Sequence, residues 1–113
     1  MLPASRDHKP IHEGNLGPNT GGMGTIAPLS YIANNKLENI KNGIVLPIIN
    51  KMKQTNPYTG ILYPGIMVTD TGEKVLEFNS RFGDPETQVY MRILKTDLFD
   101  ILIACCTGTL SEI

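Results

Sequence analysis

Two strand-like runs joined by a short turn place the strongest constraint on the fold. Residues 61–69 are rich in β-branched and aromatic side chains, which suit a pleated strand. Residues 70–73 (Asp-Thr-Gly-Glu) have the composition of a tight hairpin loop, and residues 74–81 alternate well enough to form the return strand. Pro64 cannot donate a backbone hydrogen bond, so we expect it at a sheet edge or a bulge. The sequence therefore predicts an antiparallel hairpin.

The predicted return strand has two different faces. Alternate residues of a strand point to the same side, about 6.6 Å apart along the chain. Leu76 and Phe78 are therefore expected on one face. The other face is expected to carry Val75, Glu77, Asn79 and Arg81.

The polar face of this strand has the composition of a site for a metal ion and a phosphate group. Glu77 and Asn79 offer oxygen atoms, and Mg²⁺ takes oxygen ligands from one or two protein groups beside phosphates and water. Arg81 supplies a fixed positive charge for a phosphoryl group that becomes more negative during reaction. On spacing alone, the simpler interpretation is the solvated face of an amphipathic strand.

Helices are predicted on both sides of the hairpin. Apolar residues in 29–52 recur mostly every three to five positions, which indicates a helix with one buried face, and Pro47 should kink or divide it. After the hairpin, Asp84 is predicted as the N-cap of a helix that runs to about residue 95. A further helix is predicted over 97–106, closed by Gly108. Antiparallel strands combined with helices indicate the α+β class.

Asp84 and Glu86 form a candidate pair of carboxylates for acid–base chemistry. A capping role at the start of the helix explains both residues more simply, because carboxylates interact favourably with the first turn of a helix. Both interpretations stay open on the sequence.

Residues 1–28 are polar and rich in glycine, and we interpret them as an ordered loop. The run GPNTGGMG at residues 17–24 lacks the lysine of a Walker P-loop and the strand–helix context of a dinucleotide fold. It can still bind an anion through backbone amides. A flexible linker is the alternative, but linkers tend to be repetitive in Gly and Ser, whereas this stretch mixes Pro, Asn, Thr and Met.

Composition excludes several classes of function. The 113 residues form one domain at most, and their formal net charge of -1 includes no run of Lys or Arg, which argues against a nucleic-acid partner. No apolar run approaches the length of a membrane span and no signal pattern is present, so we expect a cytoplasmic protein.

Cys105 and Cys106 are adjacent and are expected to be reduced thiols. Pro10 between His8 and His12 argues against a helical metal pair.

Five short motifs lie along nearly the whole chain. They are DHK at 7–9, GPNTGGMG at 17–24, YTGILY at 58–63, VLEFN at 75–79 and RFGDPETQ at 81–88. In their order and approximate spacing they resemble the phosphoribosylamine–glycine ligase family of ATP-grasp enzymes. The most specific of them is RFGDPETQ.

The resemblance implies a reaction and its participants. In this family ATP phosphorylates the carboxylate of glycine, and the amine of 5-phosphoribosylamine attacks the acyl phosphate to give glycinamide ribonucleotide. It implies that Glu77 and Asn79 hold Mg²⁺ or Mn²⁺ beside the ATP phosphates and that Arg81 is catalytic. It also implies a substrate- or phosphate-binding role for Asp7, Lys9, Asn19, Thr20, Gly21, Gly22 and Asp84.

The resemblance further implies a partial module. An ATP-grasp site lies between two α+β subdomains, and residues 1–113 are expected to supply the second-subdomain region without the upstream subdomain or the family's N- and C-terminal domains. We therefore expect the chain to need the missing ligase segments as partners and to be inactive alone. The alternative is a non-catalytic interaction module or the product of a truncated gene, with self-association through exposed apolar surface.

Overall fold

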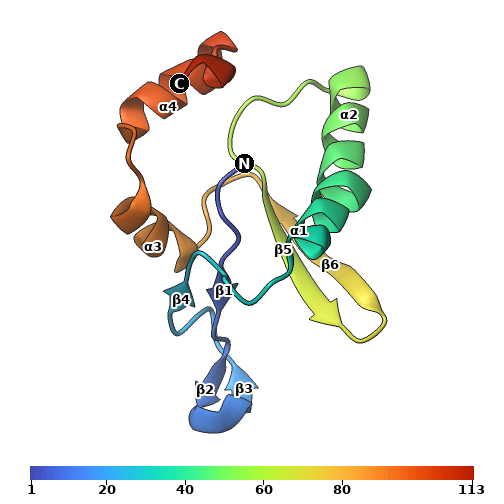
Figure 1. Cartoon of the computed structure of the whole chain (residues 1–113), viewed down its shortest axis with the longest axis vertical. Helices are drawn as coiled ribbons and strands as arrows, with labels where there is room; N and C mark the ends of the chain where they lie inside the picture. Colours follow the sequence, from blue (N-terminus) through green and yellow to red (C-terminus); the bar gives the residue numbers. More distant parts are fainter. The chain divides into compact units, whose positions relative to one another are not determined.

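A computed structural model describes all 113 residues, from Met1 to Ile113, and divides them into two compact units. Unit 1 comprises Met1–Tyr31 and Phe82–Lys95, and unit 2 comprises Ile32–Arg81 and Thr96–Ile113. Every strand pair in the chain is antiparallel, and both units contain helices (Figure 1). The α+β class predicted from the sequence is confirmed.

The predicted hairpin is present in unit 2. Strand β5 (Tyr63–Thr69) pairs with strand β6 (Gly72–Asn79), and Thr69 lies opposite Gly72, so only two residues form the loop. Gly72 has φ +112°, a conformation that residues with a side chain rarely adopt. The Thr69 hydroxyl donates to the carbonyl of Gly72 at 2.8 Å and helps to close the turn.

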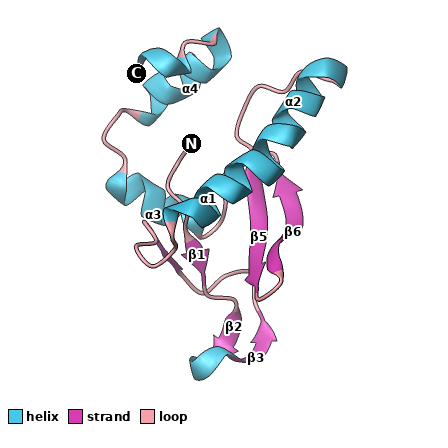
Figure 2. Ribbon diagram, turned by 45° about the vertical axis from the view of Figure 1, so that its right-hand side comes forward, coloured by secondary structure: helices cyan, strands magenta, loops and turns pink.

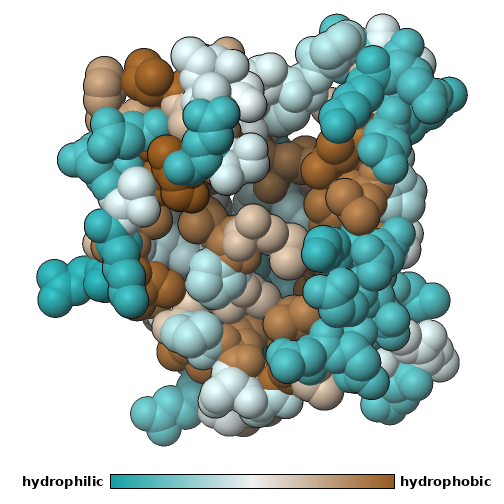
Figure 3. Space-filling model, turned by 45° about the horizontal axis from the view of Figure 1, so that its top comes forward, coloured by the Kyte–Doolittle hydropathy of each residue, from teal (hydrophilic) through white to brown (hydrophobic).

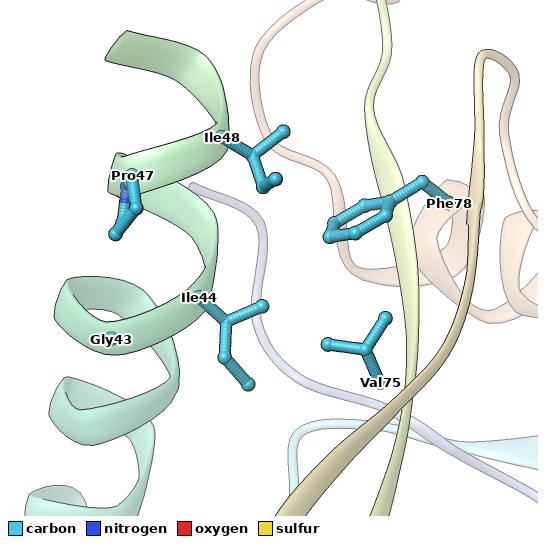
Figure 4. Close-up of a pocket in the computed structure, with 6 residues that line it drawn as sticks. All are labelled: Gly43, Ile44, Pro47, Ile48, Val75 and Phe78. Atoms are coloured by element: carbon cyan, nitrogen blue, oxygen red, sulfur yellow. The ribbon is translucent and has the colours of Figure 1, made fainter. Parts of the chain in front are cut away.

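A bulge changes the predicted faces of β6. Gly65 lies opposite Glu77 and Ile66 opposite Val75, so Leu76 is an extra residue without a partner on β5. The extra residue shifts the alternation by one position. Val75 therefore points to the same side as Phe78, toward the helix, and not to the side of Glu77 as predicted (Figure 4).

Pro47 divides the predicted helix. The helical segment consists of α1 (Asn34–Ile40), a π-helical turn over Lys41–Val45 and α2 (Leu46–Thr55). The N–H of Leu46 donates to the carbonyl of Lys41, one residue further back than in an α-helix. Proline has no N–H and its ring crowds the carbonyl four residues earlier, so the wider turn accommodates it.

Helix α2 and its preceding turn face the hairpin (Figure 2). Ile44, Pro47 and Ile48 approach Val75 and Phe78 of β6 and, with Gly43, line a shallow pocket of about 210 Å³ (Figure 4). The spacing of the helical residues, three or four apart, places them on one face of the helix. Apolar contact between this face and β6 joins the two elements.

Helix α4 (Leu98–Thr107) begins and ends as predicted. The Asp97 carboxylate accepts a hydrogen bond from the N–H of Phe99 at 2.8 Å, and Gly108 closes the helix at φ +78°. A short 3-10 turn, η3 (Leu110–Glu112), follows it.

The glycine-rich part of unit 1 is more regular than the predicted loop. Strand β1 (Arg6–Asp7) pairs with β4 (Thr25–Ile26), and β2 (Pro10–His12) pairs with β3 (Leu16–Asn19) across a 3-10 turn, η1 (Glu13–Asn15). The prediction missed these strands because none is long enough to show an alternating pattern.

Helix α3 (Glu86–Ile93) does not begin on Asp84. Pro85 occupies the N-cap position, and the Asp84 carboxylate accepts instead from the side-chain amide of Gln88 at 2.7 Å. The predicted N-cap is wrong because this carboxylate binds a side chain one helical turn away rather than a backbone N–H. The amide of Thr87 donates to the carbonyl of Gly83 at 3.0 Å.

Tyr90 ties the start of the chain to α3. Its hydroxyl donates to the carbonyl of Pro3 at 3.0 Å and shares a hydrogen bond of 2.8 Å with the Ser5 hydroxyl. Burial raises the pKa of Tyr90 above its ordinary value, because the phenolate would lose hydration.

Few side chains are buried in either unit. Ala104 and Glu86 are 4% and 3% exposed, whereas large apolar side chains such as Phe99 remain mostly exposed. Figure 3 shows apolar residues at the surface over much of the face drawn. No helix is both long and apolar enough to cross a membrane.

The cap of α4 makes a first prediction. Asp97→Ala removes the acceptor for the Phe99 N–H and is expected to lower the free energy of unfolding by about 1 kcal/mol. Asp97→Asn retains a capping oxygen and should cost much less. Urea unfolding followed by circular dichroism measures both, and equal losses for the two variants would contradict the capping role.

Candidate functional site

Glu77 and Asn79 lie together near the end of β6. The Asn79 side-chain amide donates to Glu77 Oε1 at 3.0 Å, which puts the two side chains on one face as predicted. Gly65 lies opposite Glu77, and a Cβ atom at Gly65 would stand 3.3 Å from Glu77 Cγ. Because Gly65 has no side chain, the Glu77 side chain can lie close to β5.

The hydrogen bond between these side chains decides which atoms are available to a ligand. Asn79 uses an N–H of its amide toward Glu77, so its carbonyl oxygen keeps its acceptor capacity. Glu77 is exposed and retains its second carboxylate oxygen. Two neighbouring oxygen donors suit a hard cation that takes its other ligands from phosphates and water. The chain has no group of three or more His, Cys, Asp or Glu side chains that could hold a metal ion.

Arg81 does not continue the strand face. Pairing with β5 ends where Asn79 meets Tyr63, and Arg81 is an exposed residue in a bend two positions further on. The prediction that Arg81 shares the face of Glu77 by strand alternation is wrong, since β6 ends before it. Arg81, Glu77 and Asn79 all belong to unit 2.

Residues 20–23 form an ordered turn that is hydrogen-bonded to His8 and Lys9, the two residues between β1 and β2. The Thr20 backbone N–H and hydroxyl both donate to the carbonyl of Lys9 at 2.8 Å, and the Gly22 N–H donates to the Thr20 hydroxyl at 3.1 Å. The Met23 N–H donates to the carbonyl of His8 at 2.8 Å. The bonds to Lys9 and His8 join residues 11 and 15 positions apart, so this part of the glycine-rich stretch is not a flexible linker.

Lys9 and Asp7 connect the turn to β1. The Lys9 ammonium lies 2.6 Å from Asp7 Oδ2 and donates to the carbonyl of Gly21 at 2.9 Å. The Asp7 side chain is 7% exposed and that of Lys9 is 46% exposed. Asp7 is therefore a buried carboxylate paired with a cation that reaches solvent.

Gly22 covers the Asp7 carboxylate. A Cβ atom at this position would lie 2.4 Å from Pro85 Cδ and 2.8 and 3.0 Å from the two carboxylate oxygens of Asp7. Gly22 also has φ +145°, a backbone conformation that favours glycine. Gly21, its neighbour, has open space where a Cβ would stand.

The remaining predicted residues of unit 1 are at its surface. Asn19 is exposed at the end of β3, opposite Pro10. Asp84 is exposed and engaged with Gln88. Thr25 was not predicted as a site residue, although it lies opposite Asp7 in the β1–β4 pair. Its place beside Asp7 depends on a strand pairing that the sequence pattern did not show.

Comparison with protein families identifies the module. The model of the phosphoribosylglycinamide synthetase ATP-grasp (A) domain matches residues 1–87. The chain belongs to this family. Its α+β fold is thus part of an ATP-grasp module, as the motifs predicted.

Relatives of the phosphoribosylglycinamide synthetase ATP-grasp family match along nearly the whole chain. The phosphoribosylamine–glycine ligase of Rhodopirellula baltica is 46% identical over 112 residues, covering 98% of this chain and 26% of the relative. The human trifunctional purine biosynthetic protein adenosine-3 is 48% identical over 110 residues, covering 96% of the chain and 11% of the relative.

A solved structure of the same family has the same fold. The crystal structure of phosphoribosylamine–glycine ligase from Thermotoga maritima superposes with a TM-score of 0.78 at 34% identity. The match covers 95% of this chain and 27% of that structure. The chain thus spans about a quarter, or less, of the length of the proteins that it matches.

The contact between Gly22 and Asp7 makes a second prediction. Gly22→Ala introduces a Cβ that cannot fit beside Pro85 and Asp7, and is expected to lower the free energy of unfolding by about 1–3 kcal/mol. Gly21→Ala is the matched control, since its Cβ meets nothing within 4 Å. Thermal unfolding of both variants checks the difference, and equal stability would contradict this packing.

Proposed function

We propose that this chain carries the metal- and phosphate-contacting part of an ATP-dependent ligase that joins glycine to 5-phosphoribosylamine. The products of that reaction are glycinamide ribonucleotide, ADP and phosphate, and the step belongs to purine biosynthesis. The observation that carries the proposal is the paired arrangement of Glu77 and Asn79 on β6, in a chain of this ATP-grasp family.

Glu77 and Asn79 would hold the divalent cation, Mg²⁺ or Mn²⁺. When bound, such an ion neutralises charge on the ATP phosphates and orients them for transfer. The hydrogen bond between the two side chains keeps both oxygen donors on one side of the strand before any ligand arrives. Such preorganisation lowers the cost of ordering these side chains when the nucleotide binds.

Arg81 would meet the phosphate groups from the segment just after β6. It is an exposed residue in a bend of the chain. A guanidinium is always charged and donates hydrogen bonds in a planar fork that matches phosphate oxygens. Its role is to stabilise negative charge that increases as the phosphoryl group is transferred to the glycine carboxylate.

The turn in unit 1 would contact the substrates. Lys9 keeps its cationic group partly exposed while Asp7 and the Gly21 carbonyl hold it in place. Asn19 adds an exposed amide at the end of β3, and Asp84 an exposed carboxylate before α3. A cation held in place in this way suits a phosphate or carboxylate group of a substrate.

Phosphate release tests the proposed function. The chain is mixed with separately expressed segments that supply the rest of the ligase, and ATP, Mg²⁺, glycine and freshly made 5-phosphoribosylamine are added. We expect release in the mixture and none from the chain alone. Glu77→Ala should abolish it because one of the two cation ligands is lost.

A control variant and a binding measurement make the test specific. Glu112→Ala removes an exposed carboxylate of unit 2 outside β6 and should leave phosphate release unchanged. Mn²⁺ with ADP should broaden the amide resonances of Glu77 and Asn79 in the chain but not in Glu77→Ala. Release that survives Glu77→Ala, or broadening that is equal in both proteins, would overturn the proposal.

Association through apolar surface is a second proposed function, and the exposed side chains favour it. Phe99 of α4 is 68% exposed and Leu76 of β6 is 63% exposed. Apolar side chains exposed in such number on one small chain mark association surfaces. We expect the chain to self-associate or to bind the remaining ligase segments.

Sedimentation measures this association directly. The chain should form dimers or larger species as its concentration rises, and Phe99→Asp should shift the equilibrium toward monomer because the charge opposes burial. A monomer at all concentrations, with no binding to the ligase segments, would refute the association.

A further inference from the structure

We propose that the β1–β4 pair carries a binding site for a primary amine, formed by Asp7 and Thr25. The inference deepens the proposed function, on which it rests for the identity of the amine, since glycine and 5-phosphoribosylamine both carry one. Binding of an amine by these two residues can be measured without nucleotide, metal or turnover, so its test is independent of the ligase activity.

Strand pairing brings the two side chains to one face. Strand β1 lies beside strand β4 (Figure 1). In this antiparallel pair Asp7 lies directly opposite Thr25, and Arg6 lies opposite Ile26. Side chains of directly opposite residues point to the same side of a sheet, with Cβ atoms about 4.5–5.5 Å apart. A carboxylate and a hydroxyl therefore lie side by side.

The oxygens of both side chains are buried and short of partners. Thr25 Oγ1 has no hydrogen-bond partner in the chain. Asp7 Oδ1 has none either, and Asp7 Oδ2 has only the ion pair with Lys9. The Asp7 side chain is 7% exposed, so water covers little of it. Buried acceptors of this kind are unfavourable until a donor reaches them, which makes the pair a site for a ligand that donates hydrogen bonds.

A primary amine is the hydrogen-bond donor that suits these two acceptors. An ionised carboxylate only accepts hydrogen bonds, so Asp7 Oδ1 excludes an anionic oxygen and favours an N–H group. A primary ammonium has three N–H donors and a positive charge, enough to reach a carboxylate oxygen and a hydroxyl together. Thr25 Oγ1 accepts the second of these bonds.

Lys9 shows how an ammonium meets this carboxylate. Its Nζ atom lies 2.6 Å from Asp7 Oδ2, and the carbonyl of Gly21 holds it from the other side at 2.9 Å. Lys9 is thereby committed to one carboxylate oxygen and leaves the other to the ligand.

Gly22 and Pro85 restrict what can lie against Asp7. The absent Cβ of Gly22 would stand 2.8 Å from Asp7 Oδ2 and 2.4 Å from Pro85 Cδ, so there is no space for a side chain at this point. Asp7 and Thr25 are positioning residues in this scheme, because they hold the amine and take part in no bond change.

An NMR titration of the full chain tests the site. The ligands are glycine, ethanolamine, which has the amine without the carboxylate, and acetate, which has the carboxylate without the amine. We expect glycine and ethanolamine to shift the amide resonances of Asp7 and Thr25, and acetate to leave them unchanged. The other substrate with an amine, 5-phosphoribosylamine, is titrated freshly made, with ribose 5-phosphate as the control that lacks the amine. Whichever of glycine and 5-phosphoribosylamine binds more tightly is the source of the amine.

Variants connect the binding to the two residues. Asp7→Asn should weaken ethanolamine binding about tenfold or more, and Thr25→Val by a smaller factor of about threefold, because one hydrogen bond to the amine is lost. Asp70→Asn and Thr96→Val make the same changes at exposed positions of unit 2 and should bind as the parent chain does. Thr25→Val keeps the test valid if Asp7→Asn fails to fold, which its spectrum would show.

The outcomes separate this inference from the proposed function. Glu77→Ala should bind ethanolamine normally, so loss of phosphate release with amine binding intact counts against the ligase proposal alone. Equal shifts with acetate and ethanolamine, or no shift with any amine, would overturn the amine site. The same holds if Thr25→Val and Thr96→Val bind ethanolamine alike.

Discussion

The β5–β6 ladder is the interaction on which the candidate metal site depends. Seven residue pairs join the two strands around a two-residue loop, and the bulge at Leu76 lies within them. Because the bulge shifts the alternation, Val75 and Phe78 face the helix while Glu77 and Asn79 share another face. An apolar contact and a polar pair can therefore occupy neighbouring positions of one strand.

Unit 1 is held in a different way. Its strands are too short to form a core, and backbone hydrogen bonds between residues 8–9 and 20–24 maintain the turn. The Lys9 side chain bonds both to Asp7 and to the Gly21 carbonyl, so one ion pair links a strand to the turn. Glycine is required where the chain passes over Asp7, since any side chain at Gly22 would meet the carboxylate. The glycine content of this stretch thus reflects close packing rather than flexibility.

Much of the architecture could be predicted from local patterns. The hairpin, the division of the helix at Pro47 and the capped helix after Asp97 all follow from turn chemistry, the missing N–H of proline and capping preferences. The motifs likewise predicted the family that residues 1–87 match. Each of these features depends on a few neighbouring residues, which is why the sequence shows it directly.

Other features depended on contacts between distant residues. The sequence by itself determined the residue types of the candidate site, Glu77 and Asn79 at a spacing of two, and the glycines that the turn requires. Only the tertiary structure decided that Arg81 lies beyond the strand and that Thr25 faces Asp7, because strand ends and strand partners follow from long-range hydrogen bonding. A bulge of one residue reverses the face of every position on one side of it, and local alternation carries no sign of where that residue is inserted.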